Sequence, residues 1–208
     1  MARRKPRKRQ KNKKPSHIAW GGSAARGTSR WNIALGVGAI ALIAGGAWWW
    51  WQARQTETTF LALAAQGQEG LSAVQVLPNE GRTHLQPGTA HQYSTAVPTS
   101  GAHVTVWTNP GFYREVQTPT LLVHALEHGN VVVYYDRADP DTLDMLKDWT
   151  SIYSGQWDGV IVTPSPGLGK GIVLTAWRRK LELDRFEPAL AAAFVDAFRG
   201  RGPEHAVR

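Results

Sequence analysis

The pattern of apolar and polar positions separates a long apolar run near the N-terminus from a mixed pattern over the rest of the chain. Residues 33–47 contain no polar side chain, and Trp48 to Trp51 extend the run to nineteen residues. A helix needs about 20 apolar residues to cross the hydrocarbon core of a bilayer, and tryptophan is enriched at the headgroup level. The pattern therefore predicts one transmembrane helix over residues 33–51.

The remaining pattern predicts a polar stalk over residues 52–73, helical only around residues 60–66, and a small α+β domain over residues 74–200. Residues 81–118 are rich in Gly, Pro, Ser and Thr and form a long loop in this interpretation, while residues 201–208 form a flexible tail. A thioredoxin-like layer fits the order of elements, as do other small mixed sheets. The expected strands lie at residues 74–77, 104–107, 131–135, 159–163 and 171–178, and the expected helices at 119–128, from 140 to about 150 and at 187–199.

The helix at residues 119–128 is marked at both ends. Thr118 is a good N-cap, Pro119 suits the first helical position, and Gly129 suits the position after the last turn. A continuous β-branched and aromatic run at residues 131–135 follows, as is typical of a buried strand.

Charge gives the expected orientation in the membrane. Residues 1–30 hold eleven of the 24 Lys and Arg residues and no acid, so the rest of the chain has 13 basic and 16 acidic side chains. Basic residues stay on the cytoplasmic side of a span. We therefore expect residues 1–32 to form a cytoplasmic tail that contacts anionic lipids, and residues 52–208 to lie outside the cell membrane. No aromatic residue before Trp20 is available to stack on bases, so no nucleic-acid partner is expected.

The chain contains no cysteine. Disulfides, thiol redox chemistry and thiolate metal sites are therefore excluded. Any metal site must use imidazole and carboxylate ligands.

Histidine is concentrated in one stretch, since five of the seven histidines lie between residues 84 and 128. On the expected helix, His124 and His128 are one turn apart and can reach one ion, with Glu127 beside them. Leu122, Ala125 and Leu126 would then take the buried side of this helix. A pair of polar residues on a solvated helix end, where protonated histidine favours the C-terminal dipole, is the alternative.

The string His124-x-x-Glu127-His128 is also the inverted zinc-peptidase signature, in which glutamate is the general base. Such sites use a long helix, whereas Gly129 ends this one after ten residues. A metal-dependent hydrolase with Glu127 as base stays an alternative.

The motif Pro98-Thr99-Ser100-Gly101 with His103, followed by Trp107 and the histidine motif at residues 123–129, resembles the bacterial domain of unknown function 3105. This resemblance covers roughly residues 74–200. It implies an N-terminal membrane anchor, and it supplies no activity. The positions that it implies for a site are His84, His103, His124, Glu127 and His128.

The sequence thus favours a membrane-anchored, extracytoplasmic protein with a metal site made by these five residues, in which His124 and His128 meet His103 and His84. Imidazole and carboxylate ligands, with Met145 as the only internal methionine, favour zinc or copper(II) over copper(I). The alternatives are a non-metal interaction or assembly module and the hydrolase. The sequence does not decide whether the protein is an enzyme, and it names no protein partner.

Overall fold

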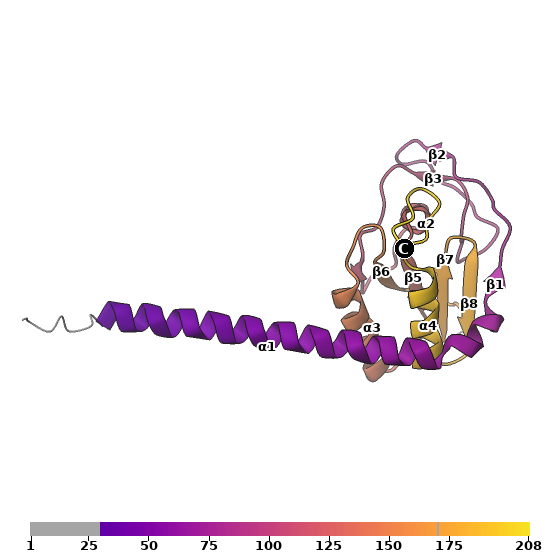
Figure 1. Ribbon diagram of the computed structural model, residues 1–208. Coiled ribbons are helices and arrows are strands. Elements are labelled where there is room, and N and C mark those ends of the chain that lie inside the picture. Colours follow the sequence, from indigo (N-terminus) through magenta and orange to yellow (C-terminus); the bar gives the residue numbers. More distant parts are fainter. Residues whose placement is uncertain (1–29, 170) are drawn as a thin grey trace, which may run out of the picture. The chain divides into compact units, whose positions relative to one another are not determined.

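A computed structural model describes residues 30–169 and 171–208 of the protein (Figure 1). The chain divides into two compact units, residues 1–44 and 45–208. Helix α1 is continuous over Arg30–Gln66. Its part from Ala34 onward is, among the described residues, the one helix long and apolar enough to cross a membrane by length and composition. The basic tail lies largely outside the described residues.

The segment expected to be a polar stalk is different in the structure. It is helical up to the end of α1, and a 3-10 helix, η1, follows at Gln68–Ala73. Phe60 and Ala64 are buried in the core of the domain. These last turns of α1 therefore belong to the folded domain, because the apolar side of this otherwise polar helix packs against the domain core.

A six-stranded mixed sheet forms the centre of the domain, in the order β1-β8-β7-β5-β6-β4. Strands β4, β6 and β5 run parallel to one another. The pairs β5–β7, β7–β8 and β8–β1 are antiparallel. The single strand expected at residues 171–178 is in fact the first arm of a hairpin, which turns at Arg178 in a left-handed conformation. The bounds are β1 Gln75–Val76, β4 Gly111–Phe112, β5 Val131–Tyr135, β6 Val160–Pro164, β7 Ile172–Ala176 and β8 Arg179–Leu183.

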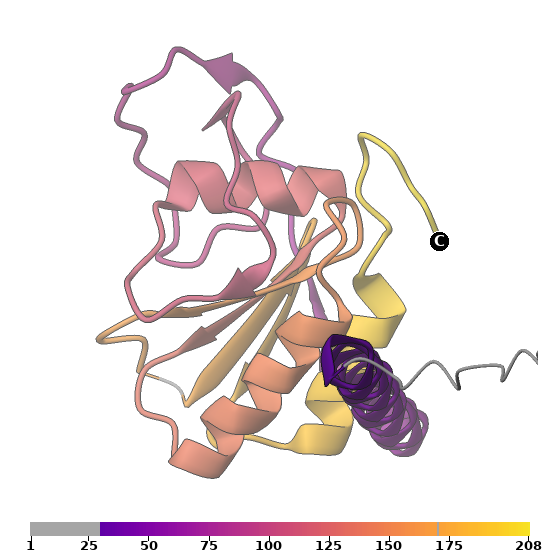
Figure 2. The same ribbon diagram turned by 90° about the vertical axis from the view of Figure 1, so that its left-hand side faces the viewer.

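Helices cover both faces of this sheet (Figure 2). Helix α2, Pro119–His128, lies on one face, and α3, Pro140–Ile152, and α4, Pro188–Phe198, lie on the other. Alternate side chains of β5 enter the two cores: Val132 packs with the α2 side and Val133 with the α3 and α4 side. This period of two is what a strand buried on both faces requires.

The expected boundaries of α2 and β5 are confirmed, and Gly129 ends α2 with a φ of 105°. Thr118 is the N-cap of α2 by position, but its side chain makes no capping bond. Asp139 does cap α3, because its carboxylate accepts a hydrogen bond from the Thr142 N–H at 2.9 Å.

A second, two-stranded sheet lies on the outer side of α2 (Figures 1 and 2). It consists of the parallel strands β2, His84–Leu85, and β3, His103–Val104. Helix α2 is thus covered on both sides, and residues 122–128 are all buried.

Candidate metal centre

The pairing of β2 with β3 places two histidines side by side. His84 is directly opposite His103 in the register of this pair. Their ring centroids are 5.0 Å apart. Two segments separated by a long loop therefore deliver one imidazole each to the same place.

The loop before β3 is shaped so that His103 points inward. Gly101 has a φ of 123°, and a Cβ on this residue would lie 3.0 Å from the Tyr93 ring. The Tyr93 hydroxyl donates to the Ala102 carbonyl at 2.7 Å, and the His103 N–H donates to the Thr83 carbonyl at 3.0 Å. The Ser-Gly motif of the sequence is therefore the turn that sets the position of the His103 ring.

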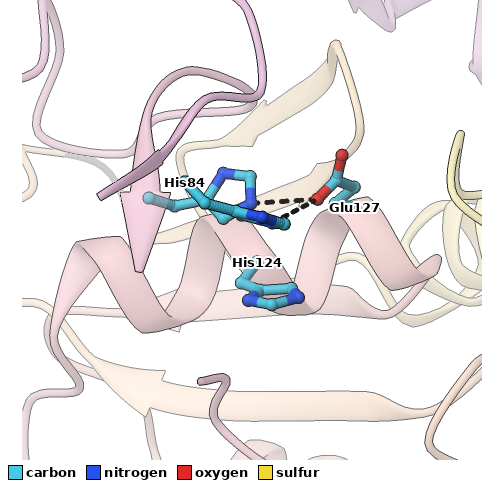
Figure 3. A group of neighbouring side chains, drawn as sticks. His84, His124 and Glu127 are labelled. Carbon is cyan, nitrogen blue, oxygen red and sulfur yellow. Dashed lines mark hydrogen bonds and ion pairs between the residues drawn. The ribbon is translucent and has the colours of Figure 1, made fainter. Parts of the chain in front are cut away.

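Helix α2 supplies the other two groups, one turn from each other. Figure 3 shows His84, His124 and Glu127 converging, with two interactions ending on the carboxylate. Glu127 Oε2 lies 2.9 Å from Nε2 of His103 and 3.7 Å from Nε2 of His84. The four ligand atoms offered by His84, His103, His124 and Glu127 all lie within 4.8 Å of one another.

Backbone carbonyls fix which nitrogen of two rings faces this group. Nδ1 of His103 lies 2.8 Å from the Gly101 carbonyl, and Nδ1 of His124 lies 2.7 Å from the Val104 carbonyl. A carbonyl oxygen only accepts, so both Nδ1 atoms carry a proton. The Nε2 atoms are then left to bind, which is the arrangement found for metal-bound histidine in general.

Burial favours the uncharged ring at His124. Its side chain is almost inaccessible, and the pKa of His124 is lowered from 6.5 mainly by this burial. The hydrogen bond to Val104 opposes the shift, and the neighbouring His103 adds to it. A neutral imidazole has the free lone pair that a metal needs.

His128 lies apart from the four-residue group. Its Nε2 is 3.0 Å from Glu204 Oε2, and its ring stacks on Trp157 with centroids 4.2 Å apart. The potential ligand atoms of His124, His128 and Glu204 form a second group within 4.8 Å. Burial, and then the neighbouring His124, lower the pKa of His128.

The structure differs from the sequence interpretation in three respects. The histidine face of α2 is not solvated, because His124, Glu127 and His128 are all less than 5% exposed. His128 was expected to share one coordination sphere with His103 and His84, yet it lies in the second group with His124 and Glu204. His91, whose role the sequence leaves open, is in neither group; it is exposed and packs against the Tyr93 ring. The C-terminal segment at residues 201–208 was expected to be a flexible tail, yet it folds back on α2, and the Glu204 N–H contacts the Glu127 carbonyl at 3.3 Å.

Two residues were missed altogether. Glu204 reaches His128, and Arg82 lies 3.8 Å from the second carboxylate oxygen, Oε1, of Glu127. No local pattern marks Glu204, since only the fold brings the chain end to α2. Arg82 stands two positions before His84, and that spacing was the only available signal.

Comparison with known protein families identifies the family of this chain. Residues 84–208 match the family described as protein of unknown function (DUF3105). The protein belongs to this family. The matched range begins at His84 and includes both groups of ligand atoms, whereas α1 lies outside it. No curated protein and no solved structure matches the chain.

Proposed function

We propose that this DUF3105 protein binds one transition-metal ion, Zn(II) or Cu(II), through His84, His103, His124 and Glu127. The observation that carries the proposal is the convergence of three imidazoles and one carboxylate, whose ligand atoms all lie within 4.8 Å of one another. Ligands of one Zn(II) are about 3–4 Å apart, because the bonds are about 2.0–2.1 Å. Small side-chain rotations close the group on an ion.

The contact between His103 and Glu127 supports a cation at this place. With its proton on Nδ1, a neutral His103 presents a lone pair at Nε2, and Glu127 Oε2 is 2.9 Å away. Two acceptors at that distance repel each other unless a proton or a metal ion lies between them. The proton would give a buried imidazolium–carboxylate pair, which is the arrangement expected of a purely structural module.

The ligand chemistry narrows the choice of metal. Three nitrogens and one oxygen suit Zn(II) or Cu(II), whereas Cu(I) prefers thiolate and thioether sulfur. Met145 lies on α3 and packs against the core on the opposite face of the sheet. Four protein ligands complete a tetrahedral shell, and catalytic zinc sites keep one position open. Glu127 is then a ligand rather than a general base, so binding or handling of the metal is favoured over hydrolysis.

Metal analysis of the full chain in detergent tests the proposal. After loading with Zn(II) or Cu(II) and dialysis, we expect one ion per chain. Glu127→Gln keeps the shape of the side chain and removes the anionic ligand, and it should weaken binding at least about a hundredfold, since loss of an outer partner alone weakens it 10–100-fold. His91→Ala is the matched control, because His91 is exposed and outside the group.

Two results would contradict the proposal. The parent chain could retain no ion after dialysis, in which case the imidazolium–carboxylate pair explains the cluster. Alternatively, Glu127→Gln could bind as tightly as the parent while it remains folded by circular dichroism.

We further propose that the domain is held on the outer face of the cell membrane, with the basic tail against anionic lipids. Two observations support this: the long apolar helix α1 and the eleven basic residues in the first thirty. Basic charge on one side of a span sets its orientation.

We also propose that the sheet is thioredoxin-like. The supporting features are the neighbouring parallel strands β4, β6 and β5, the antiparallel β7–β8 hairpin beside them, and helices on both faces. Superposition of an experimental structure on thioredoxin folds tests this arrangement, and a different strand order would contradict it.

A further inference from the structure

A second set of potential ligands adjoins the four-residue group. It consists of His124 and His128 on α2 and Glu204 on the C-terminal segment. His128 is 2% exposed, and among the described residues its Nδ1 has no hydrogen-bond partner. The set thus combines a buried imidazole, one nitrogen of which lacks a hydrogen-bond partner, with a carboxylate. An oxygen of this carboxylate, that of Glu204, lies 3.0 Å from Nε2 of His128.

The two sets share His124, and only one of its nitrogens is available. Nδ1 of His124 is engaged with the Val104 carbonyl at 2.7 Å, so Nε2 alone can bind a metal. One lone pair binds one ion. The two sets are therefore alternative positions for a single ion and cannot form a two-metal centre through His124.

Each set has one residue at the surface. The side chain of His84 in the first set is 50% exposed, and that of Glu204 in the second set is 43% exposed. His103, His124 and Glu127 are buried. His128 lies between Glu204 and His124, against Trp157. The second set therefore runs from the surface to the buried ligand that both sets use.

We propose that Glu204 and His128 form a transfer position through which a metal ion passes between solvent and the buried centre. This inference rests on the proposed metal binding at His84, His103, His124 and Glu127. During transfer, the ion keeps its bond to His124 Nε2 while the bonds to the other three residues break. Bonds to His128 Nε2 and Glu204 replace them, water completes the shell, and the oxidation state does not change. The site is then built to exchange its ion, as a protein that hands metal to a chelating acceptor must do.

Exchange kinetics with Zn(II) test the inference. The Zn(II)-loaded full chain in detergent is mixed with excess chromogenic pyridylazo chelator, and loading of the metal-free chain is followed separately. Glu204→Gln should slow both release and loading about tenfold, equivalent to about 1.4 kcal/mol in the barrier. The equilibrium dissociation constant should change less than about twofold, because a transfer position affects the barrier in both directions equally.

Glu115→Gln is the matched control, since Glu115 is exposed and outside both sets, and its rates should equal those of the parent. His128→Gln is a second variant that should slow both directions in the same way. Unchanged rates in Glu204→Gln would overturn the inference and would indicate direct exchange past His84, whose side chain is half exposed. A large loss of affinity in Glu204→Gln would also overturn it, because Glu204 would then be a ligand of the resting ion. Failure of the parent chain to bind Zn(II) at equilibrium would overturn the proposed function itself.

Discussion

Each buried imidazole of the centre is oriented by a bond that the fold supplies. The backbone carbonyls of Gly101 and Val104 hold the Nδ1 atoms of His103 and His124. His84 has a carboxylate neighbour at 3.7 Å and is half exposed. The centre is therefore rigid where the two rings are fixed and most adjustable at His84, which is the ligand best able to move when an ion binds.

Acid should destabilise the metal-free chain. Burial lowers the pKa values of His124 and His128 below the ordinary 6.5, so the folded state binds fewer protons than the unfolded state as pH falls. Stability is fully present above pH ~6.5 and is lost as pH falls from there through the lower folded pKa values. The titratable groups that face His124 are His84, His103, Glu127 and His128. We expect the thermal unfolding midpoint to fall steadily from pH 7 to pH 5.

His124→Gln should flatten this dependence, and His91→Ala, an exposed position, should leave it unchanged. A midpoint that rises on acidification would contradict the assigned direction of the shifts.

The sequence could predict that His84, His103, His124 and Glu127 come together, but it could not predict their burial. The one-turn spacing of His124 and His128 is a local property of a helix. Whether that face meets water depends on β2, β3 and the chain end, which reach it from distant parts of the chain. His128 therefore contacts Glu204 and is not part of the four-residue group.

At the scale of elements, the C-terminal end of α2 packs closely against the chain end. Gly129 has a φ of 105°, and a Cβ there would lie 2.8 Å from the Gly202 nitrogen. Gly129→Ala should therefore add a clash to the backbone strain. Gly167→Ala is the control, because Gly167 has a φ of 78° with open space around it. By urea denaturation, Gly129→Ala should lose at least about 1 kcal/mol more than Gly167→Ala, since overpacking costs about 1–3 kcal/mol. Equal losses would mean that the chain end does not press on α2.

The last turns of α1 provide a second test at this scale. Phe60 is 1% exposed and packs edge-on against Trp149 at 5.1 Å. Phe60→Ala should lower the unfolding free energy of the domain by about 3–5 kcal/mol. The neighbouring Leu61 is 45% exposed, and Leu61→Ala should change the free energy of unfolding by less than about 0.5 kcal/mol. Similar small effects would restore the interpretation of residues 52–73 as a stalk.

Elements with local start and stop signals could be predicted, and elements made by long-range pairing could not. Pro119 with Gly129, and Asp139 with Pro140, defined α2 and α3 because caps act within one turn. Strands β2 and β4 have two residues each, too few to show a period, and exist because a partner strand lies beside them. The β7–β8 hairpin was missed because Trp177 and Arg178 do not resemble the Gly-rich turns that usually mark a hairpin.

At the scale of the whole molecule, orientation in the membrane is the prediction with the widest consequence. Alkaline phosphatase, which is active only outside the cytoplasm, should be active and membrane-bound when it is fused after Arg208. Replacing the basic residues of the first thirty by glutamine should produce mixed orientations, because these residues hold the N-terminus inside. An inactive phosphatase fusion whose fluorescent-protein counterpart is bright would place the domain in the cytoplasm.

The folded-back chain end also determines how this protein can be handled. Arg208 forms an ion pair with Asp196 at 3.0 Å. Glu204, four residues before Arg208, contacts His128. A polyhistidine tag after Arg208 would bring six additional imidazoles to the mouth of the proposed transfer position, where they would compete for the same ion and mask its stoichiometry. Affinity handles therefore belong at the other terminus, and a C-terminal tag should be cleaved before any metal is counted.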